Sequence, residues 1–275
     1  MNGTTTVQLA EKTAKAVTGS VEEWTGFLQS AARLYKYSYP EQLLIYAQRP
    51  DATACASYEI WNQTMRRYVR RGARGIALPD GAGAVRYVFD VADTGARKSS
   101  REVKTWALDE NNREAVAHAL ETQYGSAAKL GIAGQLEEIA MQQSMDYWQW
   151  HQDELRSIVD GSFLEGYDEL NLEIAFRNTA AASVKYMLLS RCNLAREYQI
   201  EPEELAGVLE WNTPAASGAL GSAISELSEG VLRQIERTIR QYERSQNHDE
   251  RTDVYEERRV LDSRSDSSQI GRAHV

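Results

Sequence analysis

The stretch RRYVRRGARGIALPDG, residues 66–81, is strongly basic within a chain whose formal net charge is −9. Arginine side chains bind phosphate oxygens through paired hydrogen bonds, and a turn with glycines lets backbone N–H groups approach the same phosphates. Gly72 and Gly75 flank Ala73 and Arg74, so the spacing predicts a tight, exposed loop with arginines on both arms. The phosphate-binding candidates are Arg66, Arg67, Arg70, Arg71, Gly72, Arg74 and Gly75, with Arg49 and Arg86 as further candidates.

Aromatic residues lie close to this stretch in the sequence, namely Tyr58, Trp61, Tyr68 and Tyr87. Proteins hold single-stranded nucleic acid with a basic groove for the backbone and aromatic faces for the bases. A basic hairpin with Trp61 and Tyr87 in the core accounts for the same residues, and tryptophan is more often buried than exposed. Composition alone leaves these two interpretations open.

The charge is distributed unevenly along the chain. Residues 20–106 carry 13 Lys and Arg against 9 Asp and Glu, whereas residues 107–275 carry 16 against 30. A basic N-terminal part joined to an acidic C-terminal part favours a polyanionic partner for the N-terminal part only.

No other pattern in the sequence indicates chemistry. The four histidines (His118, His151, His248 and His274) are scattered, and none forms the HExxH spacing of a zinc hydrolase. Phosphate-binding and nucleophile motifs are absent, and Cys55 and Cys192 form no CxxC pair. We therefore expect no enzymatic activity, no metal and no cofactor. The sequence has neither a secretory signal nor an apolar run of about 18 residues, so we expect a cytoplasmic protein without a membrane partner.

The elements expected around the basic stretch are helices and a small antiparallel sheet. Residues 1–19 are expected to form a flexible tail, and Ser20 with Glu23 predicts a helix start. Pro40 predicts the start of a second helix, and a loop followed by a short helix is expected to carry Tyr58 and Trp61. Strands are predicted around Val69 and Ile76 and over residues 84–94.

From residue 112 onward the apolar spacing is helical, over 112–124, 127–160, 168–198 and 219–247. The predicted fold class is α+β, with a small domain at residues 20–106 and a mainly α-helical region at 107–245. Residues 246–275 are expected to be disordered or truncated. The last six residues, IGRAHV (270–275), match a possible translation of a common sequencing adapter, so we expect an artefactual end to the reading frame.

Residues 37–79, followed by VRYVFDVADT, resemble the N-terminal domain of the ArdC antirestriction family. The family pattern has a QxP step, an aromatic-rich segment, V-[RK]-[RK]-G-x-[RK]-G-[IT] and a strand that ends in D-x-x-x-T. The matching positions are Gln48 and Pro50, Trp61, Val69 to Ile76, and Asp90 to Thr94. The resemblance covers about residues 20–106 and implies binding of single-stranded DNA, in large proteins of conjugative elements and phages.

The chain departs from the family in two respects. Ala73 stands where a Glu is common, which removes an acid from the loop. Full-length members continue into an HExxH metallopeptidase domain, whereas residues 140–240 lack this motif, so peptidase activity is not implied. These residues instead resemble the helical region of large mobile-element proteins that carry helicase or methylase modules further on.

Two functions of different classes follow. In the first, the basic loop neutralises phosphates of single-stranded DNA, the aromatic residues stack bases, and the acidic helices serve as a spacer or docking platform. The resemblance then implies handling of transfer DNA or protection from host restriction. In the second, the chain is a protein-interaction scaffold, a fragment of a larger helicase- or methylase-containing polypeptide, whose basic loop pairs with an acidic protein surface.

Overall fold

The computed structural model describes residues 2–81, 83–195 and 200–270, with side chains up to residue 246. The fold class is α+β, as predicted from the sequence: a small set of antiparallel strands accompanies a mainly helical chain. The N-terminal helices are α1 (Gly3–Val17), α2 (Val21–Arg33) and α3 (Tyr39–Gln48). The later helices are α4 (Arg113–Tyr124), α5 (Gly131–Ser157), α6 (Glu169–Arg191), α7 (Pro202–Leu205) and α8 (Pro214–Ile270).

Local sequence signals set several helix ends where they were expected. The Ser20 hydroxyl accepts a hydrogen bond from the Glu23 N–H at 3.2 Å and caps α2. Pro40 lies in the first turn of α3, where its missing N–H costs nothing. Gly125 ends α4 with a φ of 73°, a left-handed conformation that suits glycine.

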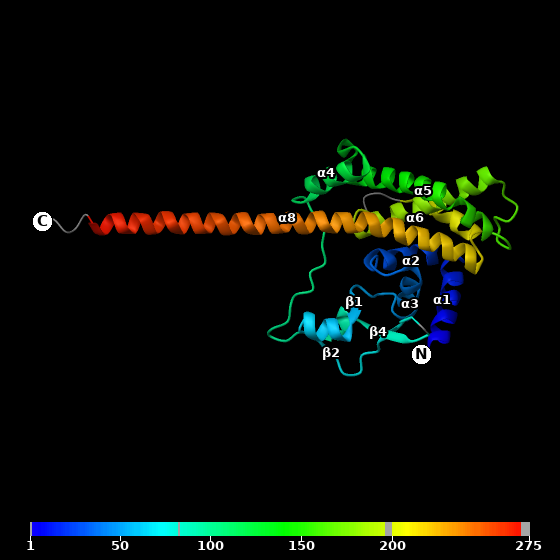
Figure 1. Cartoon of the computed structure of the whole chain (residues 1–275), viewed down its shortest axis with the longest axis horizontal. Helices are drawn as coiled ribbons and strands as arrows, with labels where there is room; N and C mark the ends of the chain where they lie inside the picture. Colours follow the sequence, from blue (N-terminus) through cyan, green and yellow to red (C-terminus); the bar gives the residue numbers. More distant parts are fainter. Residues whose placement is uncertain (1, 82, 196–199, 271–275) are drawn as a thin grey trace.

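The main hydrophobic core lies between the helices and is built from both halves of the chain. α8 runs through the molecule between α4 and α5 on one side and α1, α2 and α3 on the other (Figure 1). Trp24 of α2 is fully buried, and its indole N–H donates to Ser183 Oγ of α6 at 3.0 Å. Phe27, Phe176 and Trp211 belong to the same core. α2 and α3, which lie within the expected domain at 20–106, thus share one core with the helices of the region at 107–245.

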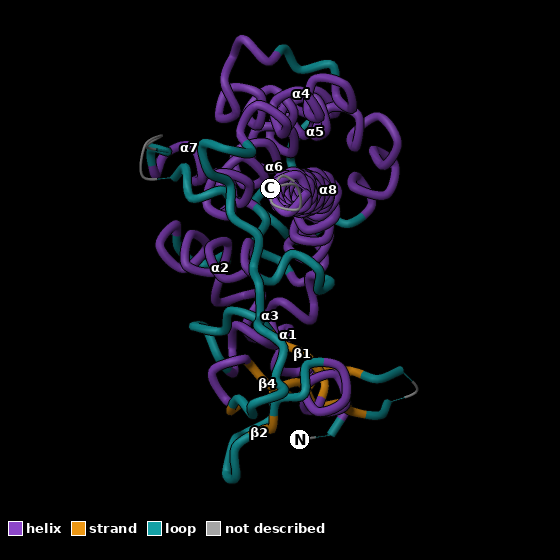
Figure 2. The backbone as a smooth tube through the Cα atoms, turned by 90° about the vertical axis from the view of Figure 1, so that its left-hand side faces the viewer, coloured by secondary structure: helices purple, strands orange, loops and turns teal. Residues whose placement is uncertain are grey.

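Two small antiparallel sheets lie at the other end of the molecule, beyond α1 and α3 (Figure 2). The strands are β1 (Cys55–Ser57), β2 (Tyr68–Val69), β3 (Ile76–Pro79), β4 (Val85–Asp90) and β5 (Thr94–Gly95). One sheet has the order β1–β4–β3, and the other pairs β2 with β5. A second, smaller core beneath the larger sheet contains Leu44, Ile45, Ile76, Leu78 and Val88.

The strands differ from the expectation in two ways. β1 occupies part of a segment that we expected to be a loop, since its pairing with β4 brings together Cys55 and Asp90, far apart in the sequence. The two strands around the basic loop do not pair with each other: β2 joins β5, whereas β3 joins β4. The loop therefore crosses from one sheet to the other rather than closing a hairpin.

Both ends of the chain also differ from the expectation. Residues 1–19 are not a flexible tail, because α1 buries Val17 completely and packs against α3 and α8. α8 begins at Pro214, five residues before the expected start of this helix at residue 219, and it extends through residues 246–270 to Ile270. Residues 271–275, most of the suspected artefact, lie outside the described residues.

Candidate nucleic-acid interface

The basic loop between β2 and β3 is a defined turn. The Ala73 N–H donates to the Arg70 carbonyl at 3.1 Å, and Gly72 between them has a φ of 86°. A turn with positive φ at its third position favours glycine, because other residues meet a steric penalty there. Gly75 has a different role: a Cβ on it would come within 3.0–3.2 Å of the Tyr87 and Phe89 side chains. One glycine thus forms the turn and the other lets the loop lie on β4.

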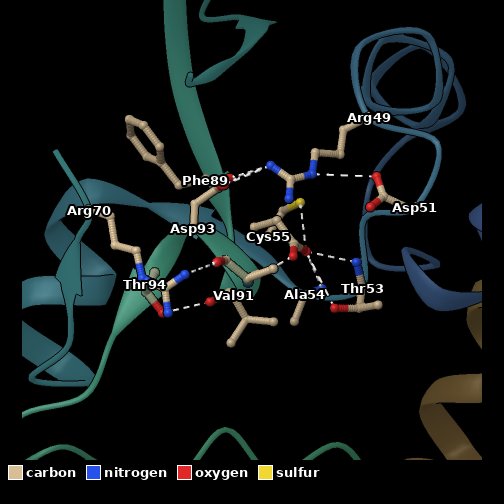
Figure 3. Close-up of polar contacts among 12 residues, drawn as sticks. Arg49, Asp51, Thr53, Ala54, Cys55, Arg70, Phe89, Val91, Asp93 and Thr94 are labelled. Atoms are coloured by element: carbon tan, nitrogen blue, oxygen red, sulfur yellow. Dashed lines mark hydrogen bonds and ion pairs between the residues drawn. The ribbon is translucent and has the colours of Figure 1, made fainter. Parts of the chain in front are cut away.

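Four of the predicted arginines are exposed: Arg70, Arg71 and Arg74 lie on this loop, and Arg66 lies just before β2. Arg70 is fixed to the short 3-10 helix Val91–Asp93 before β5, because its N–H donates to the Asp93 carbonyl at 2.8 Å and its guanidinium to the Ala92 carbonyl at 3.0 Å (Figure 3). Within the described part of the chain, none of the four forms an ion pair with a carboxylate. Their charges are therefore available to an external anion.

The other three predicted arginines, Arg49, Arg67 and Arg86, already have partners within the chain. Arg49 pairs with Asp93 at 2.7 Å and with Asp51 at 3.5 Å, and the hydrogen bond that its guanidinium donates to Asp93 raises the pKa of Arg49 (Figure 3). Arg86 pairs with Glu41 of α3 at 2.5 Å, on the inner side of β4. Arg67 is half-buried, and its Nε donates to Thr94 Oγ1 at 2.8 Å.

Exposed aromatic side chains gather on the outer face of the larger sheet, next to the loop. Tyr58 is 54 % exposed and meets Phe89 edge to face, with ring centroids 6.5 Å apart. Tyr87 is 47 % exposed and lies two residues from Phe89 on β4, so both point to the same face. Gly75 brings the basic loop against both side chains. Tyr58, Tyr87 and Phe89 are called the aromatic face below.

Trp61 is not part of this face, which corrects its assignment as a stacking residue. The short π-helix Ile60–Thr64 turns it inward, where it is 2 % exposed. Tyr68 is 41 % exposed, but its ring lies over Gly95 of the paired strand, and the Arg97 guanidinium lies 5.5 Å from the ring centroid. Of the four predicted aromatic residues, Tyr58 and Tyr87 are therefore placed best for contact with a base.

The structure adds residues that the sequence analysis missed. The segment after β5, residues 96–112, is called the strap because it runs from the strands back to α4 (Figure 1). Its start is held beside the loop, since Ser100 Oγ donates to the Arg66 carbonyl at 2.7 Å and the Arg101 N–H to the Met65 carbonyl at 2.9 Å. The basic surface, as defined from here on, consists of Arg66, Arg70, Arg71, Arg74, Arg97, Lys98 and Arg101, all exposed.

Two signals in the sequence pointed to these additions. The run RKSSR (97–101) is basic and close to the loop, and Phe89 shares the period-2 face of Tyr87.

In the described part of the chain, no three His, Cys, Asp or Glu side chains come together in a way that could hold a metal ion. No helix within residues 2–81, 83–195 and 200–270 combines the length and apolar character that a bilayer crossing requires.

Comparison with protein-family models, with curated proteins and with solved structures finds no match to this chain. The candidate interface therefore stands on its own geometry: unpaired arginines on a glycine turn, with aromatic side chains beside them.

Proposed function

We propose that the chain binds single-stranded DNA through the basic surface and the aromatic face. The observation that carries this proposal is the position of Gly75, which brings a loop with unpaired arginines against Tyr87 and Phe89. The arginines supply charge for the phosphates, and the aromatic rings supply flat apolar faces for unpaired bases. A duplex buries its base faces within the stack, so this combination favours a single strand.

The residues that resemble the ArdC family pattern support a narrower proposal. Val69 to Ile76 include the exposed glycine turn and its unpaired arginines, and Asp90 to Thr94 lead into the strand that pairs with β2. We propose that the chain is an ArdC-like, non-enzymatic DNA-binding part of a cytoplasmic mobile-element protein, acting in antirestriction or in the handling of transfer DNA.

The test is a fluorescence-anisotropy titration of the full chain with labelled single- and double-stranded oligonucleotides over a salt series. Each phosphate contact to a single strand contributes about −0.7 to the log–log salt slope, so four contacts predict a slope of roughly −3. Replacing Arg70, Arg71 and Arg74 by Gln removes three contacts, so the affinity should fall about tenfold or more and the slope should become shallower by about 2.

The matched control replaces Arg113, Arg237 and Arg244, three exposed arginines of α4 and α8, by Gln. It changes the net charge by the same amount but leaves the basic surface intact, so single-strand affinity should stay within about twofold. Equal losses in the two triple variants, or equal affinity for duplex and single strand, would contradict the proposal.

A second function, as a protein-interaction scaffold, is favoured by a cavity of about 520 Å³ between α5, α6 and α7. Its lining combines Met141, 57 % exposed, with the carboxylates of Glu203 and Glu210 and with Glu204, which pairs with Lys185 at 3.1 Å. An apolar floor with acidic edges fits a basic amphipathic peptide. The test is calorimetric titration with a Lys-rich amphipathic peptide and with its Glu-rich counterpart. Preference for the basic peptide, lost on Glu203→Gln and Glu204→Gln substitution, supports this function, and equal binding of both peptides contradicts it.

A further inference from the structure

A second basic site lies apart from the loop, where α2 and α6 end beside the strap. A cavity of about 550 Å³ opens there, and its lining includes Gln29, Arg33, Thr53, Thr105, Arg191 and Asn193. None of the described residues that line it is Asp or Glu. The volume lies within the range of small-molecule sites, roughly 300–1,000 Å³.

Both arginines are held in place by groups that leave their charge uncompensated. Arg33 donates to the carbonyls of Ala52 and Pro50, each at 2.9 Å. Arg191 donates to the Trp106 carbonyl at 3.0 Å, and its guanidinium lies 3.5 Å from the centroid of the Trp106 ring. A guanidinium fixed in this way loses little conformational entropy when it binds a ligand.

The surrounding charges do not neutralise this pair. Burial lowers the pKa of Arg33 despite the fields of Asp51 and Asp90, and burial also lowers the pKa of Arg191 despite that of Glu236. In both cases the loss of hydration outweighs the nearby carboxylates, which leaves the charged forms without full compensation. An anion that enters the cavity would supply the missing negative charge.

An adjoining cavity of about 210 Å³ shares Arg33, Thr105 and Arg191 and extends the basic character. It adds Lys36, Lys104 and Arg240, with Glu236 as the acid among its described lining residues. That carboxylate is already engaged, since Lys36 Nζ lies 2.6 Å from it and Tyr35 donates to it at 2.6 Å. Lys104 and Arg240 are paired only at the surface, with Glu102 and Glu243 at 3.8 Å each, so cationic side chains outnumber the acid in this lining.

We propose that the cavity between Arg33 and Arg191 binds the phosphate group of a nucleotide-sized phosphate monoester. A monoester carries close to two negative charges at neutral pH, which matches two guanidinium groups, and its three terminal oxygens can accept further bonds from Gln29, Thr105 and Asn193. The phosphate belongs either to a free nucleotide or to the end of a DNA strand. The proposal does not rest on DNA binding by the loop.

The first experiment is calorimetric titration of the full chain at low ionic strength with a 5′-deoxynucleoside monophosphate and with the matching nucleoside. The monophosphate should bind and the nucleoside should not. Gln29→Glu places a carboxylate in the lining while both arginines stay. The Tyr186 hydroxyl, which now accepts from Gln29 Nε2 at 2.7 Å, can donate to that carboxylate instead. We expect this variant to lose about tenfold or more in affinity, because the added charge opposes the ligand.

The control Gln149→Glu makes the same change on an exposed part of α5 and should leave binding unchanged. The Arg70, Arg71 and Arg74 triple variant should also retain monophosphate binding, which separates this site from the loop. Oligonucleotides with a 5′-phosphate or a 5′-hydroxyl then identify the source. A preference for the phosphate assigns the site to a strand end, and equal binding assigns it to a free nucleotide.

Two results would overturn the proposal. One is the absence of monophosphate binding at millimolar concentration. The other is binding that Gln29→Glu leaves unchanged while the variant melts at the temperature of the parent chain. Either result would mean that Arg33 and Arg191 serve only to complete the C-terminal turns of α2 and α6.

Discussion

The indole N–H of Trp61 donates a hydrogen bond to the carbonyl oxygen of Phe89, over 2.8 Å. This bond ties the short π-helix to β4, the strand whose outer side carries Tyr87 and Phe89. Trp61 thus holds the backbone of β4 from its buried side, and its own ring is not accessible to a ligand.

Replacing Trp61 by Phe should lower the free energy of unfolding by about 1–3 kcal/mol, because a buried hydrogen bond is lost and the Phe89 carbonyl loses this donor. Single-strand affinity, measured where the variant is fully folded, should stay within about threefold. Urea denaturation and anisotropy titration check the two parts. A variant of unchanged stability that fails to bind DNA would return Trp61 to the list of stacking residues.

Replacing Tyr58 and Tyr87 by Leu should lower the single-strand affinity more than the stability of the fold. Stacking contributes about 1–3 kcal/mol per base, so the double variant should lose at least tenfold in single-strand affinity, with an unchanged salt slope because no phosphate contact is removed. Tyr167→Leu, at a tyrosine 41 % exposed in the helical half, is the matched control and should bind normally. A changed slope in the double variant would show that the two tyrosines act through the arginines instead.

Gly72→Ala should destabilise the chain by about 1–2 kcal/mol, because its φ of 86° is unfavourable for a residue with a Cβ. Gly230→Ala is the matched control: Gly230 lies within α8 with open space around it, so the substitution should stabilise by about 0.5–1 kcal/mol. Urea unfolding measures both. If the two substitutions changed stability in the same direction, the turn at Gly72 would not have the described conformation.

Glu236 joins α8 to the end of α2 and makes the stability depend on pH. Burial raises the pKa of its carboxyl, but hydrogen bonds from Lys36 and Tyr35 outweigh burial and leave the pKa below its ordinary value of 4.5. Because the folded pKa is depressed, this contribution is present above 4.5 and is lost as the pH falls through the folded value. Glu236→Gln should therefore destabilise at pH 7 and much less below pH 4. Thermal melting over this pH range measures the effect, and a difference that does not depend on pH would exclude it.

Both thiols should react slowly in the folded protein. Burial, reinforced by Asp90, raises the pKa of Cys55 to about 12, and burial raises that of Cys192 to about 12. The thiolate is the reactive form, so labelling with a disulfide reagent at pH 8 should be on the order of 100-fold slower than in denaturant. Rapid labelling of one native thiol would identify a cysteine whose surroundings differ from those described.

The sequence predicted features that depend on neighbouring residues. Ser20, Pro40 and Gly125 act within one helical turn, so their capping roles could be recognised without the fold. The glycine turn and its exposed arginines were predicted for the same reason. The α+β class followed from the change in apolar period along the chain.

Features that depend on distant partners could not be predicted in this way. In the sequence, Arg49 and Arg86 look like Arg71, an arginine close to the glycine turn. They differ from it because Arg49 pairs with Asp93 and Arg86 with Glu41, each more than 40 residues away in the chain. The burial of α1 likewise depends on α3 and α8. The strap belongs to the basic surface because it forms hydrogen bonds to the carbonyls of Met65 and Arg66. No local sequence pattern predicts these bonds.

The strands have no chain terminus of their own. The chain enters them from α3 and leaves through the strap to α4, and residues of both helices belong to the main core. Segments at a chain terminus fray readily, whereas this sheet can open only as an internal loop whose two ends stay anchored. Hydrogen exchange at β3 and β4 should therefore approach that of the helices. A DNA strand bound at the loop would then raise the melting temperature of the whole molecule rather than that of the sheet alone.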